Sequence, residues 1–281
     1  MKISFFQYLP KFNSFKENLI KISELIDTNL KEIAKTRVLV FPEYSFTGPL
    51  NLETFNQYKK EKVFEDAKSE FAKLSTKLPS TSIVFGSMII PDGNEFHNSS
   101  PVYLNGEELG SYSKKALIYN ENYVCASNTK YPVFEVDGIK IGLAICWDLI
   151  LPEVFRHYIS LVDLVIIPSF WGLGGNKLQA QYSFSLEKKY YRELCVARAY
   201  ENAYGVLFVN SVGKYESSFY SDRMMGGSMA VMPPQGEVFF TSSKRPNELQ
   251  VVDLDFSELR KFRKYYATDK DFRYYRSRQL F

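Results

Sequence analysis

The chain alternates short apolar runs with longer segments of helical periodicity, and this alternation constrains the fold more than any other feature. An apolar run at 3–8 is followed by residues 13–34, in which apolar side chains recur every three or four positions. That spacing places the side chains on one face of a helix, whereas a short apolar run between turns is typical of a buried strand. A second strand is expected at 37–41 and a second helix at 60–78. The pattern predicts a layered α/β fold.

Turn dipeptides interrupt this alternation and predict β-hairpins. Asp92-Gly93 and Asn105-Gly106 flank a strand expected at 98–104, and Asp137-Gly138 joins two strands expected at 133–136 and 139–146. Such pairs favour the positive-φ turns of tight hairpins. Helical crossovers together with hairpins indicate mixed sheets. The other elements expected from the same patterns are strands at 82–90, 162–168 and 204–211, helices from 152 and at 187–200, and a hairpin near 228–240.

The composition excludes several classes of protein. The chain has 281 residues, of which 45% are hydrophobic and 24% are charged, as is usual for one large globular domain. A formal net charge of +3 is too small to indicate a nucleic-acid-binding surface. No apolar stretch approaches the roughly 18 residues of a membrane span, and residues 1–10 do not resemble a secretory signal. We therefore expect a cytoplasmic protein that binds neither nucleic acid nor membrane.

Histidine and cysteine are scarce, which limits the chemistry that this chain can perform. Cys125, Cys146 and Cys195 form no C-x-x-C pair, so neither a zinc ribbon nor a disulfide framework is indicated. The two histidines are His97 and His157, and we expect structural roles for both. The P-loop, H-E-x-x-H and G-x-G-x-x-G motifs are all missing from the sequence. We predict no metal and no organic cofactor.

Cys146 is the cysteine best placed for catalysis. It ends the apolar run 139–146, and open α/β sheets place their sites at the carboxyl ends of strands. Glu43 likewise follows the strand expected at 37–41, and the segment 111–117 supplies two lysines. A buried glutamate can act as the general base for a thiol, and a lysine can stabilise an oxyanion. The alternative is that Cys146 only packs, which we expect for the other two cysteines.

Three separated segments together resemble the nitrilase superfamily of carbon–nitrogen hydrolases. They are Phe41-Pro-Glu43-Tyr, Tyr112-Ser-Lys114-Lys-Ala-Leu117, and the run from Gly142 through Cys146-Trp-Asp to Arg156. The resemblance implies an α/β fold, namely a single-domain αββα sandwich with two mixed β-sheets over residues 1–258. It also implies that sandwiches pair in a homodimer or larger homo-oligomer. The basic, tyrosine-rich tail 259–281 is then expected to pack on the domain or on a partner subunit.

The resemblance also implies a role for individual residues. By position in the motifs, Cys146 is the nucleophile, Glu43 the general base and acid, and Lys114 the cation that stabilises the oxyanion. A second glutamate after the lysine motif often supports the site, and Glu121 is the best match. The family usually has a histidine where this chain has Ala116, so contacts of that imidazole are missing or replaced.

The implied activity is that of an amidase-like hydrolase, which cleaves non-peptide C–N bonds in a small-molecule amide or a related substrate. The cysteine forms a thioester while ammonia or an amine leaves, and water then hydrolyses the thioester. Cys146-Trp147-Asp148 favours an amide over a nitrile, because true nitrilases commonly carry glutamate after the Cys-Trp pair. An N-carbamoyl hydrolase, a nitrilase with the same triad and acyl transfer to an amine stay open. A catalytically silent binding or scaffolding protein also stays open.

Overall fold

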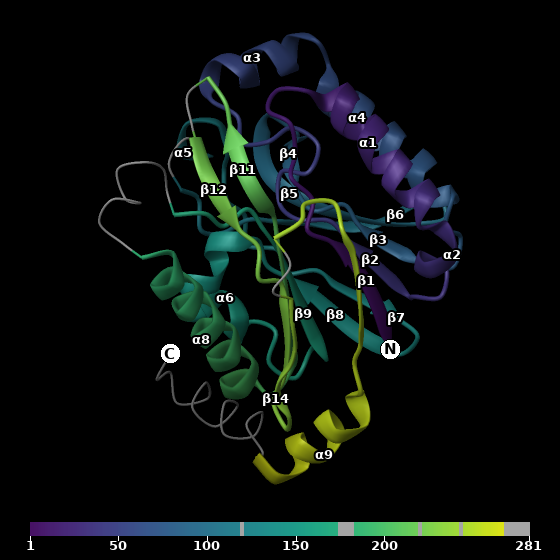
Figure 1. Ribbon diagram of the computed structural model, residues 1–281, viewed down its shortest axis with the longest axis vertical. Helices are drawn as coiled ribbons and strands as arrows, with labels where there is room; N and C mark the ends of the chain where they lie inside the picture. The colour runs from purple at the N-terminus through teal and green to yellow at the C-terminus, as the bar shows by residue number, and fades with distance from the viewer. Residues whose placement is uncertain (119–120, 174–182, 219–220, 242–243, 267–281) are drawn as a thin grey trace.

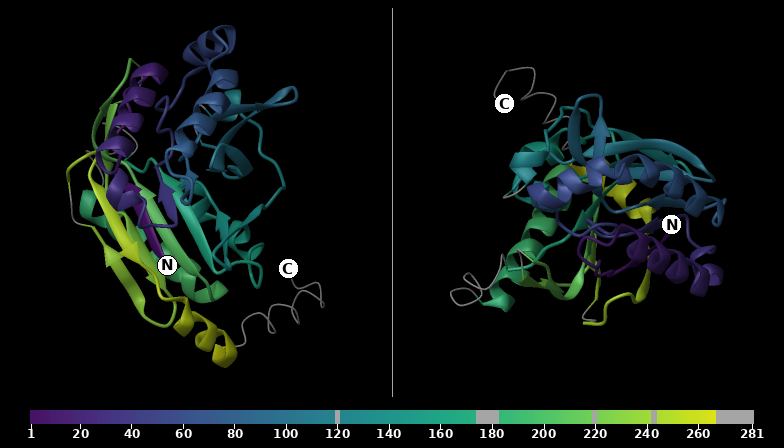
Figure 2. Two further views of the ribbon diagram at one scale, coloured as in Figure 1. Left: turned by 90° about the vertical axis from the view of Figure 1, so that its right-hand side faces the viewer. Right: turned by 90° about the horizontal axis from the view of Figure 1, so that it is seen from above.

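Two β-sheets lie face to face in the middle of the molecule, and helices cover both outer faces (Figures 1 and 2). The computed structural model describes residues 1–118, 121–173, 183–218, 221–241 and 244–266. Both sheets contain parallel and antiparallel pairs. The arrangement confirms the αββα sandwich with two mixed sheets.

The first sheet has seven strands. They are β1 (Lys2–Phe6), β2 (Val38–Val40), β3 (Ser82–Val84), β4 (Met88–Asp92), β5 (Glu95–Leu104), β6 (Glu107–Ser113) and β15 (Leu249–Asp253). The order is β15-β1-β2-β3-β5-β4, with β6 also paired to β5. β1, β2 and β3 run parallel, and the others join antiparallel.

The second sheet has six strands in the order β14-β13-β10-β9-β8-β7. They are β7 (Val133–Val136), β8 (Ile139–Leu143), β9 (Leu164–Ser169), β10 (Gly205–Asn210), β13 (Met229–Met232) and β14 (Gly236–Phe240). β8, β9 and β10 run parallel, so their carboxyl ends meet at one edge. A separate hairpin consists of β11 (Val212–Glu216) and β12 (Ser221–Met225).

The helices form the two outer layers. α1 and α4 cover the first sheet, and α6 and α8 lie on the side of the second sheet (Figure 1). The described helices are α1 (Phe15–Thr28), α2 (Leu30–Ile33), α3 (Leu52–Lys60), α4 (Val63–Thr76), α5 (Glu121–Val124), the 3-10 helix η1 (Cys146–Ile150), α6 (Pro152–Arg156), α8 (Phe184–Asn202) and α9 (Phe256–Tyr266). None of these described helices combines the length and apolarity that a membrane span requires.

Successive side chains along a strand point to opposite faces of the sheet and so belong to two different hydrophobic cores. In β2, Val38 and Val40 belong to the core between the sheets, whereas Leu39 belongs to the core beneath α1 and α4. All three side chains are buried. Burial on both faces explains why this strand reads as an uninterrupted apolar run.

The single strand expected at 82–90 is wrong, because the chain forms β3 and β4 with a turn between them. Gly86 in this turn has φ +65, and a Cβ atom there would lie 1.8 Å from the carbonyl oxygen of Pro42. The close approach leaves no room for a side chain, so glycine interrupts the strand. The three Asx-Gly hairpins are confirmed as β4–β5, β5–β6 and β7–β8.

Some helices and strands differ from those that the sequence periodicity predicts. The helix expected at 13–34 divides at Asn29 into α1 and α2, and the helix expected at 60–78 is the shorter α4. Sequence periodicity missed α3, in which only Thr54, Phe55 and Tyr58 are buried. It also missed β15 and the β11–β12 hairpin.

The described part of the basic tail is helical. α9 begins at Phe256, before the predicted boundary at residue 258, and ends at Tyr266. Leu259 is fully buried, and Arg263 donates hydrogen bonds to Asp163 and to the carbonyl oxygen of Ala203, both at 2.7 Å. Residues 267–281 lie outside the described residues, so the packing of the whole tail stays a prediction.

Candidate active site

The four residues proposed from the motifs meet in one buried cluster to which both sheets contribute. Glu43 follows β2 and Lys114 follows β6, so both extend from the first sheet, and Glu121 begins α5 farther along the same segment. Cys146 follows β8 of the second sheet. Relative exposure is 1% for Glu43 and Lys114, 4% for Cys146 and 6% for Glu121.

Lys114 is the centre of the polar contacts in this cluster. Its Nζ donates to Glu43 Oε1 at 2.8 Å and lies 2.9 Å from Glu121 Oε2. Asn98 in β5 is fully buried, and its Nδ2 donates to Glu43 Oε1 at 3.0 Å and to Glu121 Oε1 at 2.6 Å. These contacts of Asn98 were not predicted, because nothing local to this residue in the sequence indicates that it faces two carboxylates.

A tight turn after β2 directs Glu43 into the cluster. Pro42 lacks an N–H group and ends the strand, and Tyr44 has φ +58. The hydroxyl of Ser45 donates to the carbonyl oxygen of Pro42 at 2.6 Å and closes the turn. The hydroxyl of Tyr44 donates to Glu121, so the residue after the first glutamate also holds the second one.

Cys146 does not end a strand, which corrects the sequence-based expectation. β8 ends at Leu143, and Cys146 is the first residue of η1 with φ +46. Positive φ is unfavourable for a residue with a Cβ atom, and such strain concentrates at functional sites. The Glu43 carboxyl group and the Phe170 N–H group both lie close enough to the Cys146 thiol to influence its pKa.

Burial and neighbouring charges set the protonation states of the cluster. Burial raises the pKa of Glu43, although Lys114 opposes this shift. Burial and the Glu43 charge also hold the pKa of the Cys146 thiol well above its ordinary value. Burial disfavours the Lys114 ammonium, but Glu121 and Glu43 outweigh it and raise the pKa of Lys114 well above its ordinary value. The resting site therefore holds a neutral thiol beside a charged lysine.

Aromatic residues lie beside the nucleophile. The N–H group of Phe170, just after β9, donates to Glu43 Oε2 at 3.0 Å. The ring of Trp171 lies 5.2 Å from the ring of Trp147, the residue after Cys146. Asn210 fixes the backbone of Trp171 by accepting from its N–H group at 2.7 Å and donating to its carbonyl oxygen at 3.2 Å.

The other cysteines and the histidines occupy different surroundings. Burial raises the pKa of Cys125 to about 12 and that of Cys195 still higher. His97 Nδ1 lies 2.6 Å from the carbonyl oxygen of Ala126, and His157 stacks on an aromatic ring. Within the described residues, no three or more His, Cys, Asp or Glu side chains are arranged to hold a metal ion.

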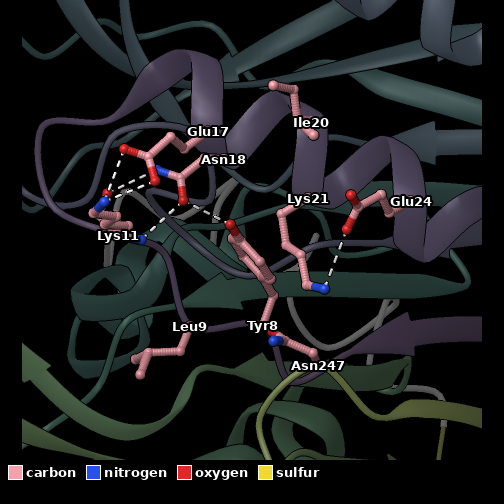
Figure 3. A pocket seen from close by; sticks show the side chains of 9 residues that line it. All are labelled: Tyr8, Leu9, Lys11, Glu17, Asn18, Ile20, Lys21, Glu24 and Asn247. Carbon is pink, nitrogen blue, oxygen red and sulfur yellow. Dashed lines mark hydrogen bonds and ion pairs between the residues drawn. The ribbon is translucent and has the colours of Figure 1, made fainter.

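A groove of 340 Å³ beside α1 is separate from the catalytic cluster (Figure 3). None of the four predicted catalytic residues lines it. Its charged side chains pair with one another, Lys11 with Glu17 and Lys21 with Glu24. We therefore place the candidate active site at the buried cluster.

Comparison with known proteins agrees with this geometry. Residues 2–264 match the model of the carbon-nitrogen hydrolase family. The chain belongs to this family. The relatives of this chain include a probable nitrilase and amidases. The chain is accordingly a carbon–nitrogen hydrolase of the nitrilase superfamily.

Individual relatives are similar over nearly their whole length. The hydrolase is 26% identical to a probable nitrilase of Schizosaccharomyces pombe, over 93% of this chain and 91% of the relative. It is 27% identical to an (R)-stereoselective amidase of Pseudomonas, over 100% of this chain and 92% of the relative. The crystal structure of a carbon-nitrogen hydrolase from Helicobacter pylori has the same fold, with a TM-score of 0.82, 19% identity, and coverage of 96% and 94% of the two chains.

Proposed function

We propose that this carbon–nitrogen hydrolase cleaves the C–N bond of a small non-peptide amide through a cysteine thioester. One observation supports the proposal most: the Lys114 ammonium is held between the carboxylates of Glu43 and Glu121, next to the Cys146 thiol. This arrangement combines a nucleophile, a proton acceptor and a fixed positive charge in a buried site. These are the groups that acyl transfer requires.

Acylation begins with proton transfer from Cys146 to Glu43. Because the thiol is neutral at rest, its sulfur becomes nucleophilic only as Glu43 takes the proton and the sulfur attacks the amide carbon. The C=O electron pair moves to oxygen. An ammonium has three N–H donors, so Lys114 can contact both carboxylates and direct the third N–H group at this oxyanion, together with a backbone N–H group.

The tetrahedral intermediate then collapses and expels the nitrogen. Glu43 returns the proton to the leaving nitrogen, and ammonia or an amine departs while the thioester forms. Water next loses a proton to Glu43 and attacks the thioester carbon. The second collapse releases the carboxylic acid, and the sulfur recovers its proton. Glu121, together with Asn98, keeps Lys114 in place through both steps.

The decisive experiment measures ammonia release from a panel of amides, N-carbamoyl compounds and nitriles by the wild type and by Cys146→Ala. We expect turnover of at least one amide by the wild type and none by the variant. Equal release by both proteins from an active substrate would exclude the thioester mechanism. Turnover of only carbamoyl compounds would show that the enzyme is an N-carbamoyl hydrolase, and turnover of only nitriles would show that it is a nitrilase, in each case with the same catalytic residues. No turnover of any kind would favour a binding or scaffolding protein.

We also propose that the enzyme works in the cytoplasm as a homodimer or larger homo-oligomer, without nucleic-acid or membrane partners. Its three free cysteines support a reducing compartment. Exposed apolar side chains along α8 support self-association. Light scattering on the purified protein tests the oligomeric state directly.

A further inference from the structure

A third buried carboxylate, that of Asp148, lies next to the catalytic cluster and has no role in the mechanism above. Asp148 is in η1, two residues after Cys146, and is fully buried. Its Oδ1 accepts from the backbone N–H groups of Lys115 at 2.9 Å and Ala116 at 2.7 Å. Its Oδ2 accepts from the Tyr112 hydroxyl and from the Ile145 N–H group, both at 2.8 Å. Each oxygen thus has two donors.

These four donors come from two separate parts of the site. Tyr112 lies in β6, and Lys115 and Ala116 directly follow Lys114, so three donors belong to the segment that carries the cation. Ile145 precedes Cys146, so the fourth belongs to the turn that carries the nucleophile. The cation extends from the first sheet and the nucleophile from the second. The Asp148 carboxylate therefore connects the segment that carries Lys114 with the turn that carries Cys146.

We propose that Asp148 is a positioning residue that fixes the Lys114 ammonium relative to the Cys146 sulfur. The inference rests on the proposed function, because it concerns the same cation and nucleophile. The flanking hydrogen bonds hold the residues on either side of the two reactive groups. Relaxing them changes the distance between the oxyanion and the ammonium, and misplacement by about 1 Å can cost 10²-fold in rate.

The chemistry of the contacts requires a carboxylate rather than an amide. Two carboxylate oxygens accept from all four donors, whereas an asparagine has one accepting oxygen and an NH₂ group that donates. In Asp148→Asn, one pair of donors would face another donor. Asparagine has nearly the same shape, so this change removes one pair of hydrogen bonds and the charge but keeps the volume. It therefore tests the hydrogen bonds of Asp148 without opening a cavity.

Asp163 offers a matched control at the opposite end of the second sheet. Its carboxylate accepts from Arg263 Nη1 at 2.7 Å and from the Lys140 N–H group at 3.0 Å. Asp163 precedes β9, whereas Cys146 follows the carboxyl end of the neighbouring β8. Asp163→Asn also removes a carboxylate that accepts a hydrogen bond from a backbone N–H group. This carboxylate lies at the end of the strands that is remote from the reactive groups.

The experiment compares kcat and KM for the wild type, Asp148→Asn and Asp163→Asn on a substrate that the wild type turns over. We expect kcat to fall about 10²-fold in Asp148→Asn, with little change in KM and a retained circular dichroism spectrum. The pH at which kcat/KM declines in acid should stay the same, because Glu43 still moves the proton. Asp163→Asn should lower thermal stability and leave kcat near the wild-type value.

Tyr112→Phe keeps the inference testable if Asp148→Asn does not fold. It removes one donor from Asp148 and retains the ring that lies 4.5 Å from the Lys115 ammonium. We expect a roughly tenfold loss of kcat without a change in KM, which is the size of one hydrogen bond to a charged group. A wild-type kcat in Tyr112→Phe, or in a folded Asp148→Asn, overturns the inference.

The inference and the proposed function fail in different ways. If Cys146→Ala retains activity, the thioester mechanism is wrong. If Cys146→Ala is inactive while Asp148→Asn is as active as the wild type, the mechanism stands and the positioning role of Asp148 is wrong. An acid limb that shifts in Asp148→Asn would also overturn it, by showing that Asp148 takes part in proton transfer.

Discussion

Glu43 and Glu121 share a single cation, Lys114, in the catalytic cluster. This excess of negative charge should influence the stability of the fold as well as catalysis. Glu43 is fully buried, and burial raises its pKa above the ordinary value of 4.5. Between 4.5 and the raised pKa, the folded protein keeps a proton that the unfolded chain has lost. The folded state then binds more protons, so stability decreases as pH rises through this window.

Glu43→Gln should therefore abolish turnover but increase stability. The glutamine keeps the shape and the contact with Lys114 but carries no charge. We expect its advantage over the wild type in free energy of unfolding to grow as pH rises from about 4.5, and to level off above the raised pKa of Glu43. Urea denaturation of both proteins across this range measures the difference. A gap that is independent of pH would contradict the raised pKa.

The same raised pKa predicts the acid limb of the enzyme's pH profile. Glu43 must be ionised to accept the thiol proton, so kcat/KM should fall as pH decreases through a pKa higher than 4.5. Activity at neutral pH does not require prior ionisation of Cys146, because its pKa is raised as well. A steady-state profile on an active substrate checks both statements. A limb at or below 4.5 would be inconsistent with a buried base.

Replacing Lys114 should affect folding as well as catalysis. Lys114→Ala leaves Glu43 and Glu121 buried without their common cation, and breaking a buried ion pair costs about 3–5 kcal/mol. Loss of an oxyanion donor costs on the order of 10²–10³ in kcat. Thermal unfolding and kinetics measure the two effects separately. Lys35→Ala, which breaks an exposed ion pair with Glu32, serves as the control for a lost surface charge.

At the scale of elements, the turns that carry the catalytic residues depend on backbone conformations that few residues adopt. Gly86 packs against the carbonyl oxygen of Pro42, the residue before Glu43. Gly86→Ala should move that carbonyl and the catalytic base together, and so lower both stability and kcat. Gly138→Ala is a matched control, because φ is also positive there but nothing lies within 4 Å. We expect it to lower stability alone, as judged by thermal unfolding and kinetics.

Much of the element pattern and of the catalytic set could be predicted from the sequence. Asx-Gly turns act locally, so the hairpins were predictable, and the motifs indicated Glu43, Lys114, Glu121 and Cys146. The interruption at Gly86 was not predictable, because it depends on a carbonyl group 44 residues away in the sequence. The contacts of Asn98 and Asp148 were not predictable for the same reason, since they join segments that are distant in the sequence.

At the scale of the whole molecule, one face of α8 exposes large apolar and aromatic side chains, although Tyr200 at its end also contacts Phe262 and Tyr266 of α9. Leu186, Tyr190, Val196 and Tyr200 of α8 are 37%, 47%, 40% and 51% exposed. If this face joins two copies, Tyr190→Lys combined with Val196→Lys should shift light scattering toward the monomer mass without changing the circular dichroism spectrum. A monomeric wild type would contradict the predicted homo-oligomer.

The division of the catalytic groups between the two sheets has a practical consequence. The first sheet supplies the base and the cation, and the second supplies the nucleophile. Neither half carries a complete reaction centre, so turnover reports that the halves have associated in the correct register. Two polypeptides cut between α5 and β7 would each lack part of the catalytic set, and we expect turnover only when both are combined. The enzyme is thus suited to a complementation sensor whose signal is the release of a small product.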